Sequence, residues 1–134
     1  MIHYRSGYKY QLHATYSIHV DIFPKEDKHT YYIDLSKEGL LTIRESYAWD
    51  GPSGPTIDTK SFLRGSLVHD ALYQLIRMGR LEKSDRKQAD KELYKICRKS
   101  GMSIVRAWYV YGMLRAFARS AVSKRKRKEV QHAP

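Results

Sequence analysis

The sequence predicts an α+β fold in which an N-terminal antiparallel β-meander is followed by three helices. Three observations lead to this prediction. Residues 13–22 alternate between apolar and polar side chains, whereas the segments after residue 60 carry apolar residues at helical spacing. The connections within the first 48 residues are too short for crossover helices, so neighbouring strands are expected to run antiparallel.

The strands are expected between residues 1 and 48. In the segment 13–22 the even-numbered residues are apolar and the odd-numbered ones polar, which is typical of a half-buried strand. Residues 30–35 and 40–47 follow as shorter strands, and a turn that ends at Gly39 separates them. A polar turn is expected at 24–28, and Tyr4, Tyr8 and Tyr10 indicate a further strand at the start.

The helices are expected between residues 61 and 122, after a loop at 49–58 that is rich in glycine and proline. The first helix, 61–78, has apolar residues around nearly its whole circumference, so it is expected to be buried and to end at Gly79. Ser84 is a candidate N-cap for a second helix that runs to Lys99 and closes at Gly101. Ser103 can cap a third helix that reaches about residue 122.

Length and composition indicate one folded domain. The chain has 134 residues, of which 42% are hydrophobic and 29% charged, so disorder along its whole length is excluded. We expect a single α+β domain over residues 1–122 and a basic tail over 123–134. Cys97 is the sole cysteine, which excludes an internal disulfide and fits a reducing compartment. No apolar run approaches a transmembrane segment, and the first residues lack the apolar core of a signal peptide.

The charged residues are unevenly distributed along the chain. The formal net charge is +11, but residues 1–60 carry 7 basic and 8 acidic side chains, whereas residues 101–134 carry 8 and 1. Five consecutive cations stand near the end, at Lys124, Arg125, Lys126, Arg127 and Lys128. Such blocks commonly bind anionic surfaces, so we expect an anionic partner, either nucleic acid or an acidic protein. A tail that only improves solubility is the alternative.

The third helix is rich in large apolar side chains. Most of these side chains are expected in the core, and the remainder are expected to make a protein–protein contact. The residues concerned are Trp108, Tyr109, Tyr111, Met113, Leu114 and Phe117.

One constellation of residues could carry chemistry. His69, Asp70 and Tyr73 lie in the first helix, and burying a histidine beside an aspartate costs free energy unless both are hydrogen-bonded or bind a cation. Asp85 and Asp90 of the second helix are acidic partners for them. Such residues suit a histidine base that is oriented by a carboxylate, with a cation held by another carboxylate. A structural cluster that only organises the fold is the alternative interpretation.

Three segments of the chain, 49–55, 67–73 and 86–90, resemble an uncharacterised family of small phage and prophage proteins. That family has the pattern Asp-Gly-x-Ser-x-Pro, then His-Asp-x-Leu-Tyr, then Ala-Asp. The match covers roughly residues 45–115, and it departs from the pattern at Gly54, where a bulkier apolar residue is expected. The resemblance implies a small bacteriophage protein that acts by binding, as a virion component or a host-takeover factor. Its location would be the bacterial host cytoplasm or the virion.

The same motifs are similar to the calcium-dependent phospholipase A2 pattern, particularly its short viral form. By that resemblance His69 would be the general base that activates a water molecule. Asp90 would hold the imidazole, and Tyr73 would bond Asp90. This resemblance implies the alternative function, a calcium-dependent lipid or ester hydrolase.

The phospholipase resemblance also implies a cofactor. Asp70 and the carbonyl groups near Gly51 and Gly54 would bind calcium, which would stabilise the oxyanion. If the protein acts by binding instead, no cofactor is expected.

Overall fold

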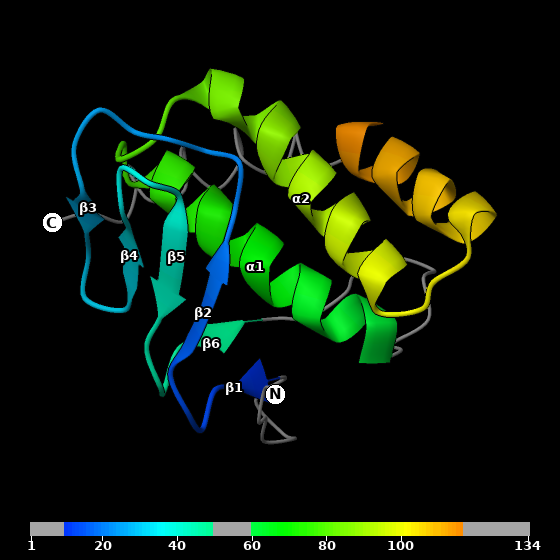
Figure 1. Cartoon of the computed structure of the whole chain (residues 1–134), viewed down its shortest axis with the longest axis horizontal. Coiled ribbons are helices and arrows are strands. Elements are labelled where there is room, and N and C mark those ends of the chain that lie inside the picture. Colours follow the sequence, from blue (N-terminus) through cyan, green and yellow to red (C-terminus); the bar gives the residue numbers. More distant parts are fainter. Residues whose placement is uncertain (1–9, 50–59, 117–134) are drawn as a thin grey trace, which may run out of the picture.

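The computed structural model describes residues 10–49 and 60–116, and strands precede helices along the chain (Figure 1). The strands are β1 (Tyr10–Gln11), β2 (Tyr16–His19), β3 (Lys28–His29), β4 (Ile33–Leu35), β5 (Leu40–Ile43) and β6 (Ala48–Trp49). The helices are α1 (Lys60–Arg77), the short 3-10 helix η1 (Lys83–Asp85), α2 (Arg86–Lys99) and a third helix described over residues 104–116. The predicted fold class, an antiparallel β-meander followed by three helices, is confirmed.

The larger sheet has four antiparallel strands in the order β2-β5-β4-β3, and β1 pairs with β6 in a second, two-stranded sheet. β3, β4 and β5 follow one another, whereas β2 lies beside β5 on its open edge. The turn between β4 and β5 requires glycine, because Gly39 has φ +88° and a Cβ there would lie 2.4 Å from the Val20 carbonyl oxygen. The Val20 N–H in turn donates to the Gly39 carbonyl at 2.8 Å, which ties the end of β2 to this turn.

The strands are shorter than expected. The predicted strand 13–22 is ladder-paired only over Tyr16–His19, because β5 offers four residues opposite it. The predicted alternation is confirmed over residues 16–22, where Val20 and Ile22 are buried while His19 and Asp21 are exposed. It does not extend to Ala14, which was expected on the apolar face but is exposed. β3 forms where the polar turn was expected to end. The expected strand residues Tyr4 and Tyr8 lie outside the described residues.

The helix boundaries follow the predicted signals with one exception. Gly79 ends α1 with φ +75°, and Gly101 follows α2 with φ +104°. The Ser103 hydroxyl accepts from the Arg106 N–H at 3.2 Å, as an N-cap does. Ser84 does not cap α2; it lies within η1, where the Asp85 carboxylate accepts from the Glu82 N–H at 3.0 Å. The third helix beyond 116 and the expected tail lie outside the described residues.

α1 is buried, as predicted, because it lies between the larger sheet and the other two helices. One core cluster joins apolar residues of the strands to α1 and α2, and a second joins α1 and α2 to the third helix. The members of the second cluster are Phe62, Leu93, Cys97, Met102, Ala107 and Val110. α1 and α2 approach closely at Gly65, where a Cβ would lie 3.2 Å from Sγ of Cys97. No helix of the described residues is long and apolar enough to cross a membrane.

The expectation that most large side chains of the third helix lie in the core is wrong. Trp108 and Tyr109 are 57% and 56% exposed. The face toward the core is formed by Ala107 and Val110, with Leu114 packed beside them, at helical spacing. These smaller side chains face α1 and α2, so Trp108 and Tyr109 are left at the surface and Tyr111 is half-buried.

Candidate functional site

Asp90 is the centre of a buried hydrogen-bond network that joins α1 to α2. Its side chain is fully buried, and Oδ1 lies 2.7 Å from Nε2 of His69 and 2.7 Å from the Tyr73 hydroxyl. His69 and Tyr73 are one turn apart on α1, so their side chains share a face and their ring centroids are 4.2 Å apart. The expectation that Asp90 contacts both residues is therefore confirmed geometrically.

A third donor to Asp90 comes from the third helix. Nη1 of Arg115 lies 2.8 Å from Oδ2 of Asp90, so both carboxylate oxygens are occupied. The Arg115 side chain is 32% exposed, and its guanidinium reaches inward to a carboxylate that no solvent touches. A buried carboxylate needs a compensating charge and donors, and Arg115 supplies part of both. Asp90 therefore links three helices.

The electrostatics of the network keep Asp90 ionised. Burial alone would raise the pKa of the Asp90 carboxyl, but hydrogen bonds and charge from His69, and the donors Arg115 and Tyr73, hold the pKa below its ordinary value. Burial and the neighbouring carboxylate together raise the pKa of the Tyr73 hydroxyl, so it stays a donor. The hydrogen bond to Asp90 likewise raises the pKa of Arg115.

The ionised Asp90 fixes the proton position on His69. A carboxylate accepts and cannot donate, so Nε2 of His69 carries the hydrogen of their shared bond. In a neutral imidazole the other nitrogen, Nδ1, then has the free electron pair. The His69 side chain is 12% exposed, and none of the described residues forms a hydrogen bond to Nδ1. Asp90 thus holds the His69 ring in an orientation in which Nδ1 points away from the carboxylate and can accept a proton.

Asp70 lies apart from this network. Its Oδ2 accepts from the Tyr47 hydroxyl at 2.7 Å, so it ties α1 to the segment between β5 and β6. Calcium takes six to eight oxygen ligands, and no group of three or more acidic, histidine or cysteine side chains in residues 10–49 and 60–116 could hold a metal. Gly51 and Gly54 lie outside the described residues. The expected calcium site, Asp70 with the carbonyl groups near Gly51 and Gly54, therefore stays a prediction.

A second buried carboxylate, Glu92, lies on α2 below the molecular surface. Its Oε2 accepts from the Asp21 N–H at 3.1 Å, from Gln88 at 2.8 Å and from Nζ of Lys95 at 2.8 Å. Lys95 also pairs with Asp21 at 2.7 Å. Burial alone would lower the pKa of Lys95, but the hydrogen bonds and charges of Asp21 and Glu92 raise it. This cluster anchors α2 to the chain after β2.

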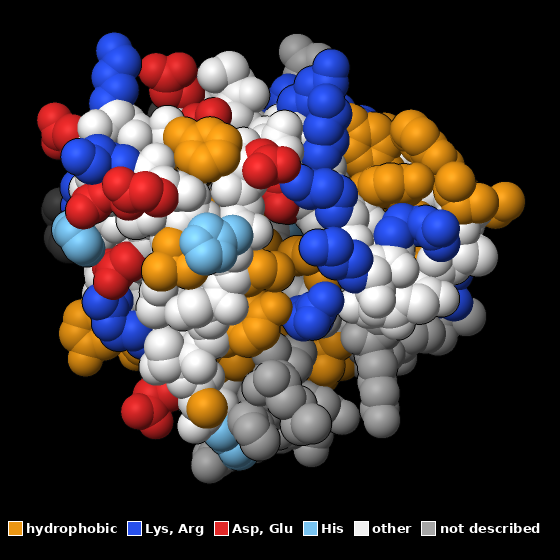
Figure 2. All heavy atoms as spheres, viewed as in Figure 1, with side chains coloured by type: hydrophobic (Ala, Val, Ile, Leu, Met, Phe, Trp, Pro, Cys, Tyr) orange, Lys and Arg blue, Asp and Glu red, His pale blue; other side chains and the backbone are white. Residues whose placement is uncertain are grey.

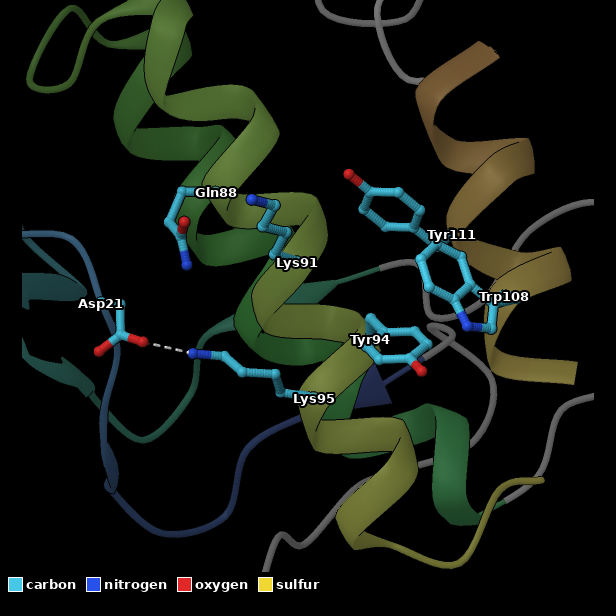
Figure 3. A pocket seen from close by; sticks show the side chains of 7 residues that line it. All are labelled: Asp21, Gln88, Lys91, Tyr94, Lys95, Trp108 and Tyr111. Atoms are coloured by element: carbon cyan, nitrogen blue, oxygen red, sulfur yellow. Dashed lines mark hydrogen bonds and ion pairs between the residues drawn. The ribbon is translucent and has the colours of Figure 1, made fainter. Parts of the chain in front are cut away.

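The outer surface between this cluster and the third helix is hollowed into a groove of about 430 Å³, here called the α2 groove (Figure 3). Asp21, Gln88 and Lys95 line its polar end. Tyr94, Trp108 and Tyr111 line its aromatic end, and Lys91 lies between the two (Figure 3). Two consecutive helices, α2 and the third helix, thus bring three aromatic rings beside two lysines.

The three rings of the α2 groove contact one another. The ring centroids of Tyr94 and Trp108 are 5.1 Å apart, those of Trp108 and Tyr111 are 5.7 Å apart, and the latter pair meets edge to face at 87°. Trp108 is the most exposed of the three. The groove therefore presents open aromatic surface to solvent.

The structure separates the predicted site residues into three groups. It brings His69, Tyr73 and Asp90 together, and it places Asp70 with a different partner. Gly51, Gly54 and the cations at 124–128 lie outside the described residues.

Sequence reasoning missed two features of the site. One is the contact of Arg115 with Asp90, and the other is the α2 groove. A signal for the first was present, since Asp90 stands beside Ala89 on the apolar face of α2 and a carboxylate there needs a cation.

No protein family, curated protein or solved structure was found to match this chain.

Proposed function

We propose that this protein works by binding an anionic partner through the outer face of α2. The observation that carries the proposal is the placement of charge on this helix. Its six basic residues lie at or near the surface, whereas its two acidic residues, Asp90 and Glu92, are buried and already bonded. The outer face of α2 is therefore cationic along its whole length.

The exposed cations of α2 recur at helical spacing. Lys87, Lys91 and Arg98 follow one stripe, and Lys99 stands beside its end. In the described part of the chain none of these four forms an ion pair with an acidic side chain. Blue side chains gather over α2 on the face drawn in Figure 2, while red ones lie mostly over the sheet. Uncompensated cations in such an arrangement favour a phosphate or carboxylate polymer.

The partner surface is proposed to extend beyond α2. The cations at 124–128 add charge, and the exposed Ile104 and Val105 of the third helix add apolar area for a protein contact. The resemblance to small phage and prophage proteins supplies the proposed setting, a virion component or host-takeover factor in a bacterial host. Under this proposal the Asp90 network organises the fold and is not a reaction centre.

The proposal is tested by titrating fluorescently labelled duplex DNA and labelled poly-glutamate with the full chain at low salt. The double variant Lys87→Gln/Lys99→Gln removes two α2 cations that do not line the groove. The matched control, Lys25→Gln/Lys37→Gln, removes two exposed lysines from the near-neutral β half. Removal of residues 123–134 measures the contribution of the expected tail.

The expected result is binding to at least one polyanion that weakens several-fold in the α2 variant and little in the control, since each lost phosphate contact removes counterion release. Equal weakening in both double variants would mean that only total charge matters. That outcome, or no binding at low salt, would contradict the proposal.

A second candidate function, a calcium-dependent lipid or ester hydrolase, is favoured by the geometry at His69. We infer that in such an enzyme Nδ1 of His69 would take a proton from a water molecule. The carboxylate of Asp90 would stabilise the imidazolium that forms, and Tyr73 would keep that carboxylate in place. Bound calcium would supply oxyanion stabilisation.

The hydrolase candidate is tested with phosphatidylcholine vesicles in calcium or in chelator. Calcium-dependent release of fatty acid by the wild type, lost in His69→Gln and retained in His19→Gln, would support it. His19 is an exposed histidine on β2 and serves as the control. An absence of release above the chelator background would sink this candidate.

A further inference from the structure

We propose that the α2 groove binds single-stranded nucleic acid by stacking an unpaired base on Trp108 while Lys91 contacts the backbone phosphate. This inference rests on the proposed function, because it names the anionic partner and the place where it is held. The convergence of three aromatic rings and a free lysine in one hollow carries the argument (Figure 3).

The aromatic end of the groove suits a nucleobase. Base faces stack on aromatic side chains, and this interaction tolerates any sequence because every base has a π face. Trp108 is 57% exposed, so much of its indole is accessible to a ligand. Tyr94 contacts the indole at a tilt of 50° and Tyr111 contacts it edge to face, so both hold Trp108 in position. The volume of about 430 Å³ lies within the usual range of ligand sites, roughly 300–1,000 Å³.

The charge beside the rings is complementary to a phosphate. Lys91 is exposed and forms no ion pair with the described residues, so its ammonium group is available. Lys95 also lines the groove, but its charge is shared with Asp21 and Glu92. The sugar-phosphate backbone of the bound nucleic acid is therefore expected near Lys91 and away from Asp21. Asp21 is exposed and would repel a phosphate at that end.

An unpaired strand fits the groove better than a duplex or an acidic protein. In a duplex the base faces are stacked on one another and only their edges are accessible. An acidic protein would need apolar side chains beside its carboxylates to cover the rings, whereas every nucleotide carries both a phosphate and a planar base. Binding sites for single-stranded nucleic acid combine accessible aromatic rings with cationic side chains in the same way.

The experiment compares two labelled strands of equal length and charge, one of thymidine nucleotides and one of abasic sugar-phosphate units. The full chain is titrated with each, and duplex DNA is a third probe. Trp108 is one of two tryptophans and the other, Trp49, is 3% exposed, so quenching of the exposed indole reports on the groove. We expect quenching by the thymidine strand and about 5- to 100-fold weaker binding of the abasic strand.

Variants locate the contact. Trp108→Ala is expected to bind the thymidine strand about 5- to 100-fold more weakly, so that it no longer distinguishes the two strands. The matched control is Tyr109→Ala, because Tyr109 is equally exposed on the same helix but does not line the groove. Lys91→Gln is expected to weaken binding and Asp21→Asn to strengthen it, since each alters the charge that the phosphate meets.

Three outcomes are distinguishable. Base-dependent binding that is lost in Trp108→Ala and kept in Tyr109→Ala supports the inference. Equal binding of the thymidine and abasic strands overturns the inference but leaves the proposed anionic partner intact. An absence of binding to any anionic polymer at low salt overturns both. The comparison of the two strands uses the wild-type chain, so the result stands even if a variant fails to fold.

Discussion

Replacing Asp90 by alanine is expected to destabilise the protein strongly. The substitution removes the acceptor of three donors at once. The Arg115 side chain is 32% exposed, so its guanidinium can be hydrated once Asp90 is gone. The side chains of Tyr73 and His69 are almost fully buried, so their donor groups lose their acceptor without gaining water. A buried donor without an acceptor costs about 1–3 kcal/mol. Two such donors sum to about 2–6 kcal/mol. The expected loss is about 3–5 kcal/mol, the part of this range that is measured when a buried ion pair is broken.

The assay is thermal unfolding followed by circular dichroism, at neutral pH. At roughly 3–4 °C per kcal/mol for a chain of this size, Asp90→Ala is expected to unfold about 10–20 °C below the wild type. The matched control is Asp21→Ala, which removes an ion pair with Lys95 whose carboxylate is 66% exposed, and its melting temperature is expected to be unchanged. An Asp90→Ala protein that melts together with this control would refute the assignment of Asp90 as the link between the helices.

The remaining predictions concern pH, thiol reactivity and helix packing. Because the pKa of Asp90 is lower in the folded state than in the unfolded chain, its stabilisation is complete above about pH 4 and is lost as the pH falls further. The wild type should therefore lose stability in acid more steeply than Asp90→Ala, and parallel acid titrations of the two proteins would contradict this. Burial raises the pKa of the Cys97 thiol to about 11, so a thiol reagent at pH 8 should label the folded chain far more slowly than the chain in urea. Equal labelling rates in the two states would show that Cys97 is accessible. Gly65→Val should lower the free energy of unfolding in urea by about 1–3 kcal/mol more than Gly112→Val, because a Cβ at Gly65 meets Cys97 and Leu93 whereas one at Gly112 meets nothing within 4 Å. Equal losses at the two glycines would show that α1 and α2 can move apart freely.

The elements of the fold could be predicted because their signals are local. The alternation in 13–22 and the apolar circumference of 61–78 follow directly from the periods of strand and helix. Gly79 and Gly101 end helices because each adopts a positive φ, which glycine accepts without strain. Ser103 was also predictable from a local signal, because a serine hydroxyl just before a helix can accept a hydrogen bond from a free N–H of its first turn.

The pairings of these elements could not be predicted in the same way. β2 pairs with β5 in the ladder of Tyr16–His19 with Leu40–Ile43, two segments that are distant along the chain and that no short motif connects. The 3-10 turn before α2 also displaced the expected cap at Ser84, because Asp85 bonds back to Glu82 instead.

In the candidate site, too, the features with local sequence signals could be predicted and those that depend on tertiary packing could not. His69, Tyr73 and Asp90 could be grouped, because helical spacing places the first two on one face and a buried carboxylate needs donors. Arg115 is 25 residues away from Asp90, so their contact depends on how the third helix packs. The α2 groove likewise arises because the small residues of the third helix face the core and leave Trp108 outside.

If the cationic face of α2 binds an anionic partner, the affinity should fall as the salt concentration rises. The measurement is the affinity of the full chain for a labelled single-stranded DNA between about 50 and 200 mM salt. We predict that the logarithm of the association constant falls linearly with the logarithm of salt concentration, by about 0.7 for each phosphate contacted. The slope should become shallower in Lys87→Gln/Lys99→Gln and should not change in Lys25→Gln/Lys37→Gln. A slope near zero, or one that is the same in all three proteins, would contradict the claim.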